Sequence, residues 1–155
     1  MKTKKNNKKG FTLVELLAVI VILAVVALIG MTTVLPRVEG ARKDAFVTEA
    51  NKFMQAAANA YATLLIDGGT ITENGGNLTT SGGTIDIRTL VSKGYINKSD
   101  MTGYSGCIEI SVTGTGSAAV ASYKIKLSNG KFNTNGYKSS VNANALSTGD
   151  VDSSC

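Results

Sequence analysis

Few side chains in this sequence have the chemistry of a catalytic or metal-binding site. The 155 residues include no histidine, and the acidic residues form no paired-carboxylate motif of the kind used in general acid–base catalysis. We therefore expect no enzyme activity, no cofactor and no metal site. The positions that could do chemistry are two cysteines, Cys107 and Cys155, and one acid, Glu15, at the start of a strongly apolar segment.

The apolar segment runs without a charge from Leu16 to Leu35. As an α-helix with a rise of about 1.5 Å per residue it is about 30 Å long, which matches the hydrocarbon core of a bilayer. Pro36 and Arg37 follow it and do not look like a signal-peptide cleavage site. We expect this segment to span a membrane and to remain in the mature protein.

The net charge of +5 originates in the first ten residues. They hold five lysines, among them Lys8 and Lys9, and no acid, so the chain from Phe11 onward is formally neutral. Under the positive-inside rule, lysines before an apolar segment stay on the cytoplasmic side of a membrane. Later lysines such as Lys124 and Lys126 fit the polar face of a hairpin, and we predict no specific nucleic-acid partner.

Glu15 has two interpretations from its position alone. It can be a carboxylate at the membrane interface, where the positive end of the helix dipole favours an acid. It can also be a polar group that is kept for a partner charge, because an acid within a membrane helix is costly.

The segment Lys8 to Leu17, KKGFTLVELL, resembles the processing site of type IV prepilins and of the related pseudopilins. The shared features are a short basic leader that ends in Gly10, then Phe11, then Glu15 four residues later, then the apolar helix. The resemblance implies that a prepilin peptidase cuts between Gly10 and Phe11 on the cytoplasmic side and methylates the new amino group of Phe11. In a bundle of such helices, the Glu15 carboxylate of one subunit could meet the Phe11 amine of its neighbour and fix the axial register.

The pattern changes from uniformly apolar to amphipathic after Pro36. From Val38 to Leu65, apolar residues recur at three- and four-residue steps, which is the helical period. We predict one nearly continuous helix from about Thr12 to Leu65, whose second half packs on a sheet. At Pro36 two outcomes stay open, a loosened turn or a helix boundary at the membrane surface.

Residues 67–155 alternate between turn signals and strand patterns. Gly pairs at 68, 75 and 82 indicate a loop with short extended pieces, and residues 88–94 a short helix. Alternating residues around Ile108 and Ile125 predict antiparallel strands, with a tight turn at Asn129 and Gly130.

The expected fold class is α+β, a long N-terminal helix packed on a small antiparallel sheet, which is also the pilin layout. Four segments follow. Residues 1–10 are a cleaved leader, 11–36 a transmembrane and filament-core helix, and 37–66 its amphipathic second half. Residues 67–155 form the globular head, with an αβ-loop, the sheet and a C-terminal loop.

Cys107 and Cys155 would be outside the cytoplasm in this orientation, where disulfides persist. A bridge between them would tie the Ser- and Asn-rich tail to a strand, and the resemblance supports it, because many pilins close a C-terminal loop by a disulfide. Two unpaired thiols are the alternative.

Three functions compete. The first is a major or minor pilin, a structural subunit of a surface filament for adhesion, motility or DNA uptake. The second is a pseudopilin of a type II secretion or competence apparatus, and the third is a membrane-anchored binding domain or enzyme. The resemblance implies as partners the prepilin peptidase, identical or related subunits, an assembly platform with its ATPase, and membrane lipid before assembly. The precursor is then a single-pass protein of the cytoplasmic membrane with a cytoplasmic leader, and the assembled form is at the cell surface.

Overall fold

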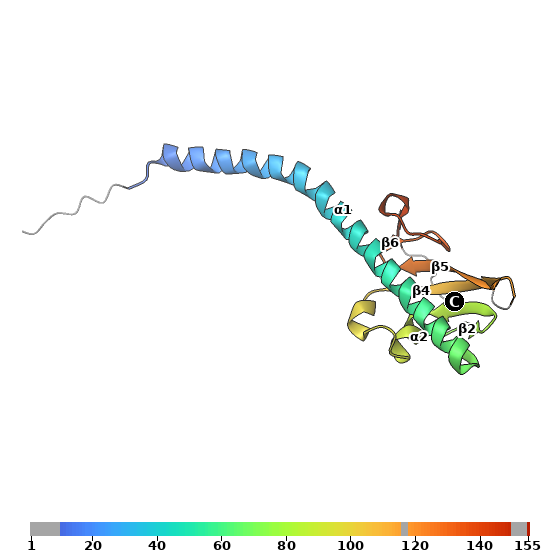
Figure 1. Cartoon of the computed structure of the whole chain (residues 1–155). Coiled ribbons are helices and arrows are strands. Elements are labelled where there is room, and N and C mark those ends of the chain that lie inside the picture. Colours follow the sequence, from blue (N-terminus) through green and yellow to red (C-terminus); the bar gives the residue numbers. More distant parts are fainter. Residues whose placement is uncertain (1–9, 116–117, 150–154) are drawn as a thin grey trace, which may run out of the picture. The chain divides into compact units, whose positions relative to one another are not determined.

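The computed structural model describes residues 10–115, 118–149 and 155 (Figure 1). The chain divides into two compact units, Met1–Gly40 and Ala41–Cys155. The first unit is helical from Leu13 onward, and the second contains the sheet and the hydrophobic core. The architecture is the predicted α+β fold, with a long N-terminal helix and an antiparallel sheet.

Helix α1 spans Leu13–Asp67, which confirms the predicted helix to within two residues at each end. Pro36 lies inside it, so no helix boundary falls there. Proline has no N–H to donate to the carbonyl of Thr32, four residues before it. The hydroxyl of Thr32 donates to the carbonyl of Ile29 at 2.9 Å. The helix ends at Gly68, where φ is 70° and the N–H donates to the carbonyl of Leu64 at 2.9 Å. This is the αL type of helix C-cap, which favours glycine.

The sheet has seven antiparallel strands, and their order in space is their order along the chain. The strands are β1 (Thr70–Glu73), β2 (Gly76–Thr79), β3 (Gly82–Asp86), β4 (Ser105–Thr113), β5 (Val120–Ser128), β6 (Phe132–Asn133) and β7 (Ser147–Thr148). Helix α2 (Ile87–Ser92) and the 3-10 turn η1 (Lys98–Met101) lie between β3 and β4, and the 3-10 turn η3 (Ala143–Ala145) precedes β7.

The segment predicted as a loop with short extended pieces forms the first three strands of the sheet, each four or five residues long. Asn74 and Gly75 join β1 to β2 with φ of 53° and 85°, the positive values that tight hairpin turns require. Gly83 lets β3 lie close to β2, since a Cβ at Gly83 would overlap the carbonyl oxygen of Asn77. The glycines therefore serve turns and close strand contacts.

The other predicted elements of the head are present. Ile108 and Ile125 face each other across β4 and β5. Asn129 forms the turn after β5, where its Oδ1 accepts hydrogen bonds from the N–H groups of Lys131 and Phe132 at 3.1 and 2.8 Å. The predicted short helix is α2, which begins one residue earlier than expected.

The core of the second unit lies between the sheet and one stripe of α1. The stripe has apolar side chains at helical spacing, all 6% exposed or less: Phe46, Ala50, Phe53, Ala57, Ala60 and Leu64. Phe46 packs edge-on against Phe132, with ring centroids 6.4 Å apart, and Phe53 packs against Tyr104 at 5.7 Å. The amphipathic half of α1 thus covers the apolar face of the sheet, as expected.

Candidate processing and assembly site

The predicted cleavage junction lies just before α1 begins. Gly10 and Phe11 are outside the helix, and the Phe11 side chain is 87% exposed. A backbone that is neither helical nor buried can enter the cleft of a peptidase without local unfolding. Lys8 and Lys9, the predicted leader charges, lie outside the described residues.

Thr12 and Glu15 form a reciprocal cap at the start of α1. Oε2 of Glu15 accepts hydrogen bonds from the backbone N–H of Thr12 at 2.8 Å and from its hydroxyl at 2.9 Å. In return, Oγ1 of Thr12 accepts from the N–H of Glu15 at 3.3 Å. This is a capping box, in which the N-cap side chain and the third helical residue satisfy each other's backbone donors. The carboxylate is thereby bound within its own chain.

The capping box explains how a charge is tolerated at the start of an apolar helix. A carboxylate that leaves water is costly unless it is hydrogen-bonded. The first turn of a helix also favours an acid, because the unpaired N–H groups there carry partial positive charge. The capping box thus supports the interpretation of Glu15 as a carboxylate at the membrane interface. It is also compatible with a later replacement of Thr12 by another partner of the carboxylate.

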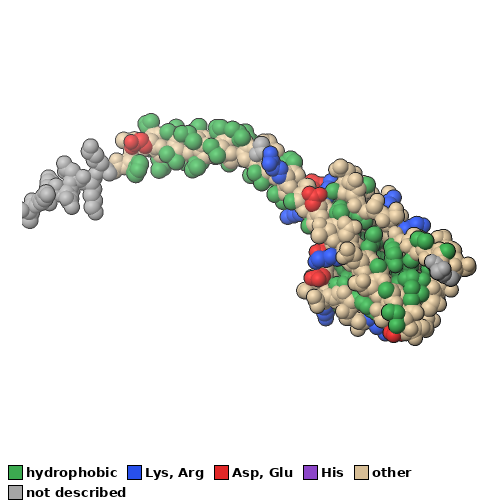
Figure 2. All heavy atoms as spheres, in the orientation of Figure 1, with side chains coloured by type: hydrophobic (Ala, Val, Ile, Leu, Met, Phe, Trp, Pro, Cys, Tyr) green, Lys and Arg blue, Asp and Glu red, His purple; other side chains and the backbone are tan. Residues whose placement is uncertain are grey.

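Successive apolar side chains along the first half of α1 are exposed, so they lie on every side of the helix. Figure 2 shows them on the face in view. The large apolar side chains from Leu13 to Leu35 are each between 52% and 81% exposed. Within the described part of the chain, α1 is the helix long and apolar enough to cross a membrane, with a mean hydropathy of 3.1 over 18 residues. A helix that is apolar all round is stable only among lipids or other apolar helices.

A family model for the prokaryotic N-terminal methylation motif matches residues 5–31. The chain carries the type IV prepilin signature. The match covers the second half of the basic leader, the Gly10–Phe11 junction, the capping box and most of the exposed apolar segment. No curated protein and no solved structure matches the chain. The prepilin signature supports a type IV pilin-like or pseudopilin precursor, and it fits an anchor in the membrane.

The two cysteines of this prepilin-like chain are joined in the head. Cys107 and Cys155 form a disulfide with a Cα–Cα distance of 5.4 Å and a sequence separation of 48 residues. Cys107 is fully buried in β4. Cys155 lies near the turn at Gly75, where a Cβ would be 3.8 Å from its carbonyl carbon. The bridge therefore fixes the last residue across the end of β3, as the resemblance implied.

An ion pair between the buried Asp86 and the half-exposed Arg88 lies beside the disulfide. Asp86 is 2% exposed, and its Oδ1 accepts from the N–H of Arg88 at 2.8 Å, which caps α2. The Arg88 guanidinium also donates to Oδ1 at 2.9 Å and to Oδ2 at 2.7 Å. The hydrogen bond and charge of Asp86 raise the pKa of Arg88 above its usual value. The Arg88 guanidinium therefore stays charged near neutral pH, and the buried Asp86 carboxylate has donors at both oxygens.

The sequence analysis missed two of these features. The capping box was visible as Thr12 followed three residues later by Glu15, directly before an apolar run. The role of Asp86 had a weaker signal, an acid just before a short predicted helix. The residues that the structure describes contain no group of three or more His, Cys, Asp and Glu side chains arranged to hold a metal ion.

Proposed function

We propose that this chain is a structural subunit of a type IV pilus filament. It is made as a membrane-anchored prepilin, cut by a prepilin peptidase and polymerised through the first half of α1. The observation that carries the proposal is the overlap of the methylation motif, residues 5–31, with the exposed apolar helix. A chain with this arrangement needs a processing enzyme before assembly and apolar partners after it.

Cleavage after Gly10 removes the five leader lysines and leaves a cationic amine on Phe11. The precursor has no charged amine at this position, and Glu15 bonds to Thr12 instead. In the filament, the new amine of one subunit takes the place of Thr12 at the Glu15 carboxylate of its neighbour. The capping box thus holds the acid until a charged partner exists.

The charge pair matters because apolar side chains alone do not specify the axial register of neighbouring helices. Moving an aliphatic helix from lipid to a bundle of similar helices brings no hydrophobic gain, since lipid tails are as apolar as leucine. Aliphatic side chains also allow neighbouring helices to slide along each other. A buried ion pair contributes specificity more than stability, so Glu15 sets the axial register.

Mass spectrometry of filaments sheared from the cell surface tests the proposal. We expect an abundant chain that begins with methylated Phe11. Gly10→Leu should block this processing, and Gly40→Ala, a substitution at an open position of α1, should not. A processed chain found only in membranes would favour a pseudopilin of a secretion or competence apparatus. A surface chain that still begins at Met1 would overturn the assignment.

The role of Glu15 is tested by Glu15→Gln, with Glu39→Gln as the matched control on the same helix. The first variant keeps the shape and removes the charge that the Phe11 amine needs. We expect it to be cleaved at the normal rate but to yield few or no surface filaments, while the control assembles. Normal filaments from Glu15→Gln would contradict the charge pair without affecting the processing assignment.

A further inference from the structure

The head contains three Asn–Gly pairs, all outside helices and strands: Asn74–Gly75, Asn129–Gly130 and Asn135–Gly136. In such a pair the backbone nitrogen of the glycine can attack Cγ of the asparagine side chain, because glycine has no Cβ to hinder the approach. Asparagine is accordingly one of the thermolabile residues of proteins. The three pairs differ in how firmly their surroundings hold the side-chain amide.

Hydrogen bonds hold the amides of two of these asparagines. Nδ2 of Asn74 donates to the hydroxyl of the buried Thr89 at 3.0 Å. Oδ1 of Asn129 accepts from two backbone N–H groups of the turn that follows it, at 3.1 and 2.8 Å. The attacking nitrogen is held there as well, since the N–H of Gly130 donates to the hydroxyl of Ser128 at 3.3 Å. These bonds have to break before the amide can turn towards the glycine nitrogen.

Asn135 lacks such a restraint on its side chain. Among the described residues, none forms a hydrogen bond with its side-chain amide or with the N–H of Gly136. The backbone N–H of Asn135 donates to Oδ1 of Asn133 at 2.9 Å, a contact that does not involve the amide. Asn135 is exposed, and a Cβ at Gly136 would meet no atom within 4 Å. The amide can therefore rotate towards the glycine nitrogen without breaking a contact.

The backbone around Asn135 is a short loop that is attached to β5 at both ends. The N–H of Thr134 donates to the carbonyl of Leu127 at 3.0 Å, and the N–H of Lys138 donates to that of Ile125 at 2.9 Å. Residues 134–138 thus lie against residues 125–127 only, so residues 135–137 bulge away from the strand. A change of the backbone angles in this loop leaves the two attachments to β5 in place.

We propose that Asn135 is a site of spontaneous deamidation on the head. The nitrogen of Gly136 bonds to Cγ of Asn135 and loses its proton, and the bond from Cγ to Nδ2 breaks, so that ammonia leaves. Water then opens the cyclic imide and gives aspartate or isoaspartate. Water is the one co-reactant. The proposal goes beyond filament assembly and does not depend on it, because all of these residues belong to the second unit.

The reaction changes the surface of old copies of the chain. A carboxylate replaces a neutral amide next to Tyr137 and Lys138, where Nζ of Lys126 also lies 5.4 Å from the centre of the Tyr137 ring. An isoaspartate also adds one backbone atom to the loop whose ends bond to β5. Long-lived copies therefore differ from new ones in charge and in the length of this loop.

Incubation of the purified full chain in dodecylphosphocholine micelles at mildly alkaline pH tests the proposal, because the glycine nitrogen attacks after it loses its proton. Peptide mass spectrometry follows the mass gain at each Asn–Gly pair over time. We expect Asn135 to convert about fivefold faster than Asn74, whose amide has one hydrogen bond to break, and to convert faster than Asn129 by a larger factor.

The ranking of the three sites decides the outcome. Equal rates, or faster conversion at Asn74 or Asn129 than at Asn135, would overturn the proposal. So would an Asn135 amide that survives many half-lives of a free peptide of residues 133–137.

Two substitutions separate the effect of the surroundings from that of the sequence. Asn135→Gln keeps an amide but has to close a larger ring, so the mass gain at this position should disappear. A gain that persists would contradict the assignment. Thr89→Val removes the hydroxyl that holds Asn74, so conversion at Asn74 should rise about fivefold while Asn135 stays unchanged as the internal control. An unchanged rate at Asn74 would contradict the restraint on which the ranking rests.

Discussion

Sγ of Cys155 lies 4.0 Å from Oδ2 of Asp86, so the disulfide ends beside the carboxylate that caps α2. Asp86 is also the cross-strand partner of Cys107. Strands β3 and β4, helix α2 and the last residue therefore meet at one corner of the head. The disulfide thus bonds the last residue covalently to β4, next to the end of β3 and the start of α2.

Removal of the disulfide should destabilise the head. For a loop of this length, with a separation of 48 residues, the chain-entropy model gives about 4 kcal/mol. We expect Cys155→Ser to lower the thermal unfolding midpoint of the purified chain. Reductant should lower the midpoint of the wild type and leave that of the variant unchanged. Equal midpoints of the wild type with and without reductant would contradict a stabilising bridge.

Loss of the capping hydroxyl should fray the start of α1. Thr12→Val keeps the size of the side chain and removes its hydrogen bond with Glu15, at a cost of about 1 kcal/mol. Hydrogen exchange in micelles should become faster at Leu13 to Glu15. Thr32→Val, which removes a hydroxyl from the middle of the same helix, is the control, and it should leave exchange at these residues unchanged.

Gly83 should not tolerate a side chain. Its φ is 137°, and a Cβ there would overlap the carbonyl oxygen of Asn77 on the neighbouring strand. Gly83→Ala should therefore cost about 2 kcal/mol or more in the free energy of unfolding. Gly130→Ala is the comparison, because φ is also positive there but a Cβ meets no atoms. It should cost about 1 kcal/mol. Equal losses in the free energy of unfolding of the two variants would show that the close contact between Gly83 and Asn77 does not matter for stability.

Glu73 should make the stability of the head depend on pH. Its carboxylate pairs with Lys93 at 2.8 Å and accepts from the hydroxyl of Ser92 at 2.8 Å, and these contacts lower its pKa below the usual 4.5. A lowered pKa means that the contribution is present above pH 4.5 and disappears as pH falls through the folded-state value.

We therefore expect Glu73→Gln to reduce the urea midpoint at neutral pH. The difference from the wild type should shrink well below pH 4.5, where both side chains are uncharged. A difference that stays constant across this range would show that the effect of the substitution is not electrostatic.

Periodicity predicted the helical part of the fold well. The apolar run and the three- and four-residue spacing after it located α1, because burial against lipid or a sheet imposes the period directly. Strands with a regular alternation, such as that around Ile108, were predicted for the same reason. Strand β2 was not, since only Leu78 and Gly76 of its four residues are buried and its glycine hides the alternation. The Asn74–Gly75 turn was the available signal for this hairpin.

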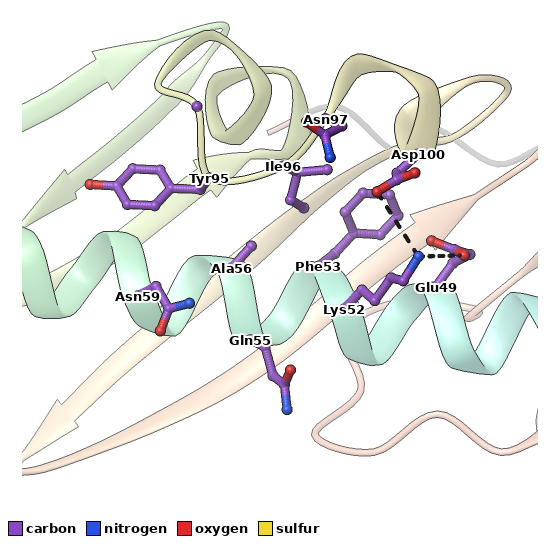
Figure 3. Close-up of a pocket in the computed structure, with 11 residues that line it drawn as sticks. Glu49, Lys52, Phe53, Gln55, Ala56, Asn59, Tyr95, Ile96, Asn97 and Asp100 are labelled. Carbon is purple, nitrogen blue, oxygen red and sulfur yellow. Dashed lines mark hydrogen bonds and ion pairs between the residues drawn. The ribbon is translucent and has the colours of Figure 1, made fainter.

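The pocket between α1 and residues 94–100 (Figure 3) could not be predicted in this way. Its walls come from residues 49–59 and 94–100, which the fold brings together although they are far apart in the sequence. Neither segment carries a recognisable sequence motif, because each contributes single side chains at irregular intervals. Among the described residues, Oε2 of Glu49 is buried without a hydrogen-bond donor, and this too follows from packing in three dimensions and from no local pattern.

The strand order of the sheet has a consequence for the kinetics of folding. Because each strand pairs with the one before it in the chain, the sheet can grow one hairpin at a time, from β1 towards β7. The steps from β1 to β3 and from β4 to β6 close short loops, whereas β4 and β7 follow longer connections. Local contacts of this kind favour fast folding. Under the proposed function the head crosses a membrane with its amino-terminal end first, and this strand order would let the strands pair in the order in which they arrive.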